Sequence, residues 1–199
     1  DWSPLGQQIA FVSQRAGSPQ IWLVDLEAEG EARFRSLTEG VEGQQSDPAW
    51  SQDGRFLAFA NYLDGLWRIY LLDMSEANAR PLVLGSGQMP SWSPSGEYIS
   101  AIVRDAQHSY LTVYNLEGGL ALPTQQLPGY PTSMEWVRQP ISEENLAAAP
   151  EPASQAAWMQ FAAADGRQHL VELAGVQAPY PELNALAQPS FAALRERAA

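Results

Sequence analysis

Three segments of the chain share one pattern of apolar and polar positions. Each has a tryptophan, a turn segment that runs from serine to glycine, a polar residue and then an apolar run typical of a strand. The three copies are Trp2–Phe11, Ala49–Phe59 and Trp92–Ala101. A pattern written three times indicates a fold built from repeated units.

The spacing of the copies identifies the size of the unit. The motif tryptophans Trp2, Trp50 and Trp92 are 48 and 42 residues apart, which is near the period of four-stranded β-propeller blades. A polar residue that closes a strand follows each tryptophan at the same offset of 23 residues: Asp25, Asp73 and Asn115. The motif tryptophans and the polar residues that close the strands therefore predict the same alignment of the three repeats.

Within each unit, the pattern predicts four short strands. The first ends on the motif tryptophan, and the Ser-to-Gly segment is a tight turn, because glycine accepts a positive φ there. The second strands are expected at Ile9–Ser13, Phe56–Asn61 and Tyr98–Arg104. The loops that follow are expected at Gln14–Pro19, Tyr62–Leu66 and Asp105–Ser109. The third strands end at Asp25, Asp73 and Asn115, and fourth strands are expected around Ala32–Leu37, Arg80–Leu84 and Leu120–Leu127.

A fourth copy begins at Trp136, but it lacks the turn signature. Residues 140–156 are rich in Ala, Pro and Glu and are interpreted as an exposed loop insertion. The strand pair resumes at Ala157–Phe161 and Gln168–Leu173, joined by the hairpin signal Asp165-Gly166. We therefore expect propeller blades over residues 1–175, followed over 176–199 by an extended linker and a short helix at Pro189–Ala199.

The repeat resembles a known family. Asp47–Gly54 and Pro90–Gly96 are similar to the WD40-like PD40 repeat of TolB-type β-propellers, and the resemblance covers about residues 1–173. It departs at Leu5 and Ser95, where the family usually has Asp. The resemblance implies an all-β fold of four-stranded blades around a channel, with protein or peptide partners or, in some members, an attached peptidase. Three clear blades and one degenerate blade are fewer than a usual ring, so we expect blades missing upstream, or two chains that complete each other.

Composition narrows the classes of partner. The chain has 11 Lys and Arg and 23 Asp and Glu, which give a net charge of −12. This charge disfavours binding to nucleic acid and anionic membranes and favours basic or neutral partners. The chain has no Cys, which excludes disulfides and thiolate chemistry. No apolar run approaches the length of a membrane span. The chain begins with Asp1 inside the repeat, so we interpret it as a processed chain or a fragment.

Candidate chemistry is sparse. A catalytic residue is needed once, whereas the motif Trp and Asp recur in each copy, so Trp2, Trp50 and Trp92 are interpreted as packing between blades. The turn and cap positions Asp25, Asp53 and Asp73 are interpreted as structural. His108 and His169 lack metal-site spacing, and Glu143-Glu144 is interpreted as solvated loop. No nucleophile elbow, zinc or phosphate-loop motif occurs. We therefore predict no catalytic residue, metal or cofactor within these residues.

A partner surface is predicted where loops gather. In a four-stranded meander, loops that join second to third strands share one face with the segments that enter first strands. The mixture of aromatic and charged residues there is typical of protein contacts. These candidate residues are Arg15, Tyr62, Asp64, Trp67, Arg104, Asp105, His108 and Tyr110.

Three hypotheses follow. The first is a non-catalytic propeller that binds a protein or peptide in an extracytoplasmic bacterial protein. The second is an accessory propeller of a larger hydrolase, such as a peptidase, whose catalytic domain lies outside these residues. The third is a structural subunit that completes a ring or assembly by self-association. The mass of the native protein separates a fragment from a complete self-assembling chain.

Overall fold

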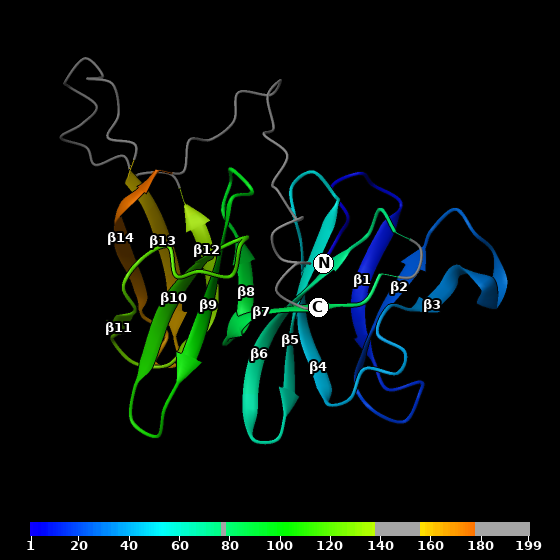
Figure 1. Ribbon diagram of the computed structural model, residues 1–199, viewed down its shortest axis with the longest axis horizontal. Coiled ribbons are helices and arrows are strands. Elements are labelled where there is room, and N and C mark those ends of the chain that lie inside the picture. The colour runs from blue at the N-terminus through cyan, green and yellow to red at the C-terminus, as the bar shows by residue number, and fades with distance from the viewer. Residues whose placement is uncertain (77–78, 138–155, 178–199) are drawn as a thin grey trace, which may run out of the picture.

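The computed structural model describes residues 1–76, 79–137 and 156–177, whose strands form four antiparallel sheets (Figure 1). The first sheet contains β1 (Gln8–Ser13), β2 (Gln20–Asp25) and β3 (Phe34–Ser36), with a short 3-10 helix, η1 (Gly30–Arg33), before β3. The second contains β4 (Gln44–Trp50), β5 (Phe56–Leu63), β6 (Leu66–Asp73) and β7 (Leu82–Ser86). The third contains β8 (Gln88–Trp92), β9 (Tyr98–Arg104), β10 (Ser109–Asn115) and β11 (Gln125–Leu127). The fourth contains β12 (Pro131–Val137), β13 (Ala156–Ala163) and β14 (Gln168–Gln177). The all-β fold class is confirmed.

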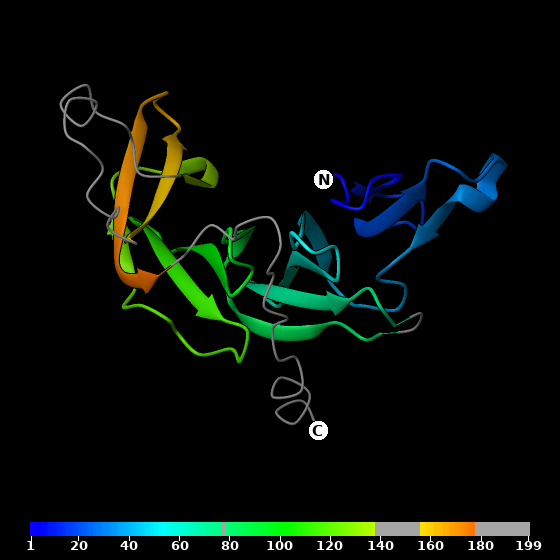
Figure 2. The ribbon, with the colours of Figure 1, turned by 90° about the horizontal axis from the view of Figure 1, so that it is seen from above.

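The four sheets, called blades 1 to 4 in chain order, are arranged as parts of a propeller. Figure 2 shows them following one another along an open arc. Strands β4, β8 and β12 are the first strands of their sheets, and β4 contacts β8, which in turn contacts β12. The first strands therefore converge along one edge of the arc, as blades do around a propeller axis.

The repeated turn has the expected geometry. Gly54 lies at φ 71° and its N–H donates to the Ser51 carbonyl at 2.9 Å. The Ser51 hydroxyl accepts from the Phe56 N–H at 2.8 Å and donates to the Asp53 carboxylate at 2.6 Å. Ser95 occupies the position of Asp53 in the third copy, and its hydroxyl lies 3.1 Å from that of Ser93. These side-chain hydrogen bonds thus stabilise the tight turn between the first and second strands of the blade.

The polar residue at the end of each third strand caps the following turn, as predicted. The Asp25 carboxylate accepts from the Glu27 N–H at 2.9 Å, and the Asn115 side chain accepts from the Gly119 N–H at 2.8 Å. Asp73 is the most buried of the three, with 3% of its surface exposed. Burial alone would raise its pKa, but hydrogen bonds from the Ser75 hydroxyl and N–H, with the Arg55 guanidinium, hold the pKa below its ordinary value.

Asp73 therefore gives the fold a pH dependence of known sign. Because its folded-state pKa is lowered, the ionised form stabilises the fold above the ordinary pKa of about 4, and this contribution disappears as the pH falls through the lowered value. We expect Asp73→Asn to reduce the free energy of unfolding by about 1 kcal/mol at pH 7, because charge-assisted hydrogen bonds become neutral ones. Urea titrations should show this difference shrinking toward pH 2. A difference that stays constant across this range would contradict the role of the ionised carboxylate.

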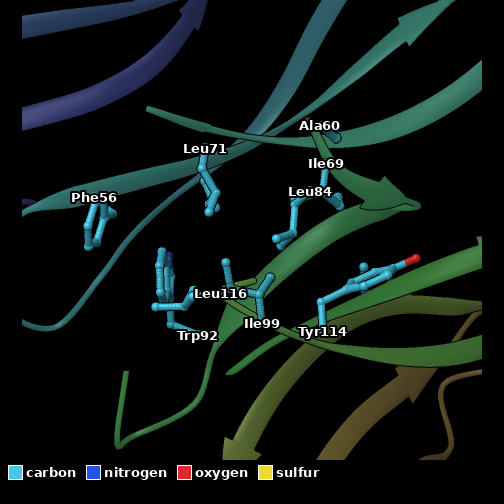
Figure 3. Packing of buried hydrophobic residues seen from close by; sticks show 11 residues of the cluster. Phe56, Ala60, Ile69, Leu71, Leu84, Trp92, Ile99, Tyr114 and Leu116 are labelled. Atoms are coloured by element: carbon cyan, nitrogen blue, oxygen red, sulfur yellow. The ribbon is translucent and has the colours of Figure 1, made fainter. Parts of the chain in front are cut away.

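The hydrophobic core lies between the blades. The junction of blades 2 and 3 buries Phe56, Ile69 and Leu71 against Trp92 and Ile99, with other apolar residues around them (Figure 3). Phe56 and Trp92 stack with ring centroids 6.3 Å apart. Six consecutive residues of β5 are buried, because a neighbouring blade covers each face of this sheet.

Several expected boundaries differ in the structure. The expected loop Tyr62–Leu66 shrinks to Asp64-Gly65, because β5 and β6 pair as far as Leu63 and Leu66. The fourth strands are shorter or shifted, at Phe34–Ser36, Leu82–Ser86 and Gln125–Leu127. The first strand of blade 1 is reduced to a single bridge between Trp2 and Ile9.

The prediction that Trp2 packs between blades is wrong for the described residues. Trp50 and Trp92 are 7% and 8% exposed, whereas Trp2 is 61% exposed, because no described sheet lies on its side of blade 1. The proposed insertion lies outside the described residues except for Ala156, which opens β13. The proposed helix at 189–199 lies wholly outside them. The division at residue 175 stays a prediction.

Candidate partner-binding face

Hydrogen bonds bring the predicted loops together with the segments that enter the first strands. The Gln45 N–H, in β4, donates to the Pro19 carbonyl at 3.0 Å, and the Gly87 N–H, before β8, donates to the Trp67 carbonyl at 3.0 Å. Before β12, the Tyr130 hydroxyl donates to the Gln107 carbonyl at 3.3 Å. We call this edge of the molecule the loop face. The β5–β6 and β9–β10 hairpins lie along the lower edge of Figure 1.

Tyr62 and Trp67 form an aromatic pair on the β5–β6 hairpin. They lie directly opposite each other across the two strands, and their ring centroids are 5.1 Å apart. Tyr62 is 37% exposed, and Trp67 is partly buried against the core between blades 2 and 3. Asp64 and Gly65 lie at φ 53° and 80°, as a two-residue type I′ turn requires. Asp64 therefore has a turn role, and the aromatic pair stands on a rigid hairpin.

Asp105 organises the β9–β10 loop. Its carboxylate accepts from the N–H groups of Gln107 and His108 at 2.8 and 2.7 Å and from the Tyr110 hydroxyl at 2.9 Å. These bonds hold the pKa of Asp105 below its ordinary value, and the bond to Asp105 raises the pKa of Tyr110. The His108 Nδ1 is 3.7 Å from the Asp105 carboxylate. Asp105 and Tyr110 thus fix the loop that presents His108.

The two predicted arginines each contact a neighbouring element. Arg104 donates to the Pro131 carbonyl and joins blade 3 to blade 4. The guanidinium carbon of Arg15 lies 4.0 Å from the centre of the Phe34 ring, and one guanidinium nitrogen is 3.6 Å from the Glu31 carboxylate. Arg15 therefore covers the sheet of blade 1. Among the candidate residues, Tyr62 contacts Trp67, and Asp105 contacts His108 and Tyr110.

Sequence reasoning missed two positions on the first strands. Asp47 and Met89 lie at φ 50° and 55°, each at an irregularity in the pairing of β4 or β8. The Asp47 carboxylate accepts from the Met89 N–H at 3.3 Å and so ties blade 2 to blade 3. A signal was present in the sequence, because Pro48 and Pro90 each follow these residues and proline cannot donate to a strand ladder.

A groove of about 700 Å³ lies away from the loop face, between the outer parts of blades 1 and 2. Arg35, Asp73 and Arg80 contribute to its lining. No cluster of three or more potential metal ligands occurs in residues 1–76, 79–137 and 156–177. Within these ranges, no helix has the length and apolarity needed to cross a membrane.

A comparison with known protein families tests the relationship to TolB-type propellers that the repeats suggest. The family model described as PD40, TolB beta propeller domain, matches residues 1–132. The chain belongs to this family. Solved TolB structures share the fold of this PD40 protein. TolB from Acinetobacter baumannii has a TM-score of 0.52 and 24% identity over 64% of this chain and 31% of its own. Putative TolB from Agrobacterium tumefaciens has a TM-score of 0.52 and 16% identity over 89% of this chain and 65% of its own.

Curated relatives of the PD40 protein carry two kinds of name. Uncharacterized peptidase YuxL of Bacillus subtilis is 30% identical over 111 residues, which are 51% of this chain and 16% of YuxL. Tol-Pal system protein TolB of Desulfotalea psychrophila is 30% identical over 93 residues, which are 45% of this chain and 20% of that protein. The PD40 chain thus spans a fifth or less of these relatives.

Proposed function

We propose that the PD40 protein is a non-catalytic scaffold that binds a protein or peptide partner through its loop face, outside the bacterial cytoplasm. The observation that carries this proposal is the Tyr62–Trp67 pair at the tip of a hairpin. Relatives named Tol-Pal system protein TolB support a protein partner, because the name assigns them to a system of proteins. Residues of the β9–β10 loop, with Arg104 and Arg15 on the neighbouring blades, would complete or border this surface.

The hairpin meets the physical requirements of a binding anchor. Tyrosine and tryptophan supply large contact areas and dominate binding energy when a partner covers them. The pairing of β5 with β6 runs without a break from Phe56 to Leu63, so the rings are held before any partner arrives, which lowers the entropic cost of binding. The buried part of Trp67 packs on the core and leaves Tyr62 as the more accessible ring.

Charge indicates the kind of partner. The chain carries a net charge of −12, so its long-range field attracts basic segments and repels nucleic acid. Asp64 at the hairpin tip is an exposed carboxylate of the loop face. A basic or neutral peptide with apolar side chains therefore suits the proposed surface.

Tyr62→Ala tests the proposal directly. Peptides selected from a random displayed library against the whole chain should bind Tyr62→Ala about tenfold more weakly, which is the loss expected when an aromatic anchor is truncated. Isothermal titration calorimetry measures the affinities. Val83→Ala is the matched control, because Val83 is exposed on β7 away from the hairpin. Peptides that bind both variants like the native chain would show that the loop face is not the site.

A second candidate function is an accessory propeller of a larger peptidase. The similarity to the protein named peptidase YuxL favours it. In that case the catalytic residues would lie outside the 199 residues, and the propeller would control access to them. A native protein with a mass near 21.8 kDa would rule this candidate out.

A further inference from the structure

A groove of about 470 Å³ lies between blades 2 and 3, the two inner blades of the arc. It follows β10 from Tyr110, at the start of this strand, to Tyr114 near its end. Sites of about 300–1,000 Å³ are large enough to hold a small ligand. Ser86 of blade 2 lines one side, and the other side comes from blade 3, mainly from Val103, Tyr110, Thr112, Tyr114 and Leu120.

Blade 2 has glycines where the neighbouring blades have leucines. Gly85 lies opposite Ile69 in the β6–β7 pair. The same place in blade 1 belongs to Leu37, which packs into the core between blades 1 and 2. Two residues further on, Gly87 has the place of Leu127 in blade 3, which is buried between blades 3 and 4. Blade 2 therefore adds no side chain to its junction with blade 3 at either position.

The Tyr114 ring is a fixed part of the groove. It is 6% exposed and lies against Gly85, where an added Cβ would collide with the ring. Its hydroxyl donates to the Ser86 carbonyl at 2.8 Å, and Figure 3 shows the ring beside Leu84 with the hydroxyl pointing away from the apolar cluster. Burial raises the pKa of Tyr114, so the hydroxyl stays protonated at neutral pH and keeps this bond.

Two more hydroxyls along β10 are engaged by the protein itself. The Tyr110 hydroxyl donates to the Asp105 carboxylate at 2.9 Å, and the Thr112 hydroxyl donates to the Ala101 carbonyl at 3.1 Å. Polar side chains that have partners within the protein gain little from a polar ligand. The aromatic rings and methyl groups of β10 are therefore what a ligand in the groove would contact.

Aliphatic side chains complete the apolar lining. Val103 lies opposite Tyr110 across the β9–β10 pair. Leu120 bridges to Tyr114 and is 57% exposed, so it adds apolar surface beside the opposite end of the groove. A large apolar group, which would cover these side chains, therefore suits the groove better than a charged one.

The other end of the groove adjoins the loop face. Tyr110 lines the groove and belongs to the β9–β10 hairpin of the loop face. On the opposite side, Gly87, the residue after Ser86, donates to the Trp67 carbonyl at 3.0 Å. A peptide that covers the aromatic pair of the β5–β6 hairpin would therefore lie beside the groove.

This end of the groove is acidic. Asp105 is exposed, and its carboxylate accepts from Tyr110 of the groove. Hydrogen bonds, first of all from the Gln107 N–H, hold the pKa of Asp105 below its ordinary value, so the carboxylate is ionised at neutral pH. Together with the net charge of −12, this charge favours a partner that carries Arg or Lys next to its apolar side chain.

We propose that the groove between blades 2 and 3 binds one aromatic side chain of a peptide partner, and that Asp105 pairs with a basic residue next to it. This inference rests on the proposed function, because it assigns a place to a side chain of the same peptide. The rings of Tyr110 and Tyr114 pack on the inserted side chain, whereas Tyr62 contacts the peptide outside the groove.

An NMR titration of the whole 199-residue chain tests the proposal. The probe is a peptide of Gly and Ser residues that carries one Arg-Trp pair, added up to about 1 mM so that weak binding is seen. We expect the backbone amides of Ser86, Val103 and Thr112 to shift as the peptide is added. A peptide with Ala in place of Trp should bind at least about tenfold more weakly, because it lacks the aromatic anchor.

Two substitutions at Ser86 test the groove itself. Ser86 is exposed, and its contact with Tyr114 uses the backbone carbonyl, so both variants keep this hydrogen bond. Ser86→Phe places a ring in the groove and should weaken binding of the probe at least about tenfold. Ser86→Ala is the matched control, which leaves the groove open and should bind like the native chain. Thermal melts verify that both variants are folded.

A second pair of variants tests the apolar end of the groove. Leu120→Ala should weaken binding about fivefold, because it removes apolar contact area. Leu26→Ala is the control, since Leu26 lies in the first blade's segment after β2 and is 48% exposed, close to the 57% of Leu120. It should leave the affinity unchanged.

The charge pair is tested from both sides. Asp105→Asn should weaken binding of the Arg-Trp peptide about two- to fivefold, as expected for an exposed ion pair. A peptide with Gln in place of Arg should bind Asp105→Asn and the native chain equally. Equal losses for both peptides would mean that Asp105 acts only by holding its loop, and the charge pair would be disproved.

Other results would overturn the proposal. The first is no binding up to about 1 mM, and the second is binding that Ser86→Phe leaves unchanged. The third is free indole that binds as tightly as the peptide, which would indicate a small-molecule site. The fourth is a native chain whose mass doubles at high concentration while Ser86→Phe stays a monomer, because a second copy would then occupy the groove.

Tyr62→Ala separates this proposal from the proposed function. Library peptides that lose affinity with Tyr62→Ala but bind Ser86→Phe like the native chain would leave the loop-face function intact and disprove the groove. Peptides that lose affinity only with Ser86→Phe would support the groove and disprove the role of the aromatic pair. We expect both variants to weaken the same peptides.

Discussion

Phe56→Ala is expected to lower the free energy of unfolding by about 3–5 kcal/mol, the usual cost of removing a fully buried phenylalanine. Phe56 has no exposed surface and stacks on Trp92 across the junction of blades 2 and 3. The substitution removes this stacking and leaves a cavity between two blades. Blades contact mainly their neighbours, so the loss should weaken the whole arc at its middle.

Urea denaturation followed by tryptophan fluorescence measures the effect, with hydrogen exchange to locate it. We expect the amides of β5, β6, β8 and β9 to lose the most protection, because these strands form the damaged junction. Val83→Ala serves as the control, since Val83 is 51% exposed and should change stability by less than about 0.5 kcal/mol. A cost for Phe56→Ala as small as that of the control would mean that the blades are not held by this core.

The repeat could be predicted because the same physical demand recurs in each blade. Every blade needs an aromatic residue for its junction, a glycine that adopts positive φ and a polar cap at the end of the third strand. Gly54 and Gly96 lie at φ 71° and 73°, and the caps Asp73 and Asn115 accept hydrogen bonds from the turns that follow. Local chemistry decides these features, so they are visible in local sequence.

Individual hydrogen bonds between residues far apart in the sequence could not be predicted. Arg104 reaches the Pro131 carbonyl, 27 residues away, and Trp92 reaches the Ala49 carbonyl, 43 residues away. The exposure of Trp2 depends on what covers blade 1, which no property of the Trp2 motif reveals. The expected topology places Arg15 and Arg104 on the candidate face, but it does not reveal that each is engaged with a neighbouring element.

On the candidate face too, some features could be predicted from the local sequence and others could not. Asp64 and Asp105 have the polar character of binding residues, but both serve the loops that hold them. Tyr62 keeps an accessible ring beside a hairpin turn of two residues. The dipeptide Asp64-Gly65 is a signal for a two-residue hairpin turn. The expected loop was nevertheless longer, by analogy with the loops of the other repeats.

Gly43→Ala is expected to lower the free energy of unfolding by about 3 kcal/mol, from backbone strain and from damage to a buried polar network. Gly43 lies at φ 105°, and a Cβ there would be 2.5 Å from the Asn61 Oδ1 and 2.6 Å from the Tyr62 carbonyl oxygen. The Tyr62 carbonyl belongs to the backbone and cannot move aside without disturbing β5. Asn61 is 1% exposed and donates to the Glu42 carbonyl at 3.0 Å.

The network that Asn61 anchors links blade 1 to blade 2. Its Oδ1 accepts from the Gln45 side chain at 3.1 Å, and the Gln45 Oε1 accepts from the Thr38 hydroxyl at 3.2 Å. The Thr38 hydroxyl in turn accepts from the Ile21 N–H at 3.0 Å. Displacing Asn61 would leave buried polar groups without partners, each at a cost of about 1–3 kcal/mol.

Gly40→Ala separates strain from collision. Gly40 lies in the same segment at φ 77°, and a Cβ there would have no neighbour within 4 Å. It should therefore show only the backbone cost of about 1–2 kcal/mol. Urea titrations of the two variants under one set of conditions measure the difference, which reports the contact with Asn61 and Tyr62. Equal losses would mean that the segment before β4 yields to the added methyl group, and that the polar network does not fix how blade 1 meets blade 2.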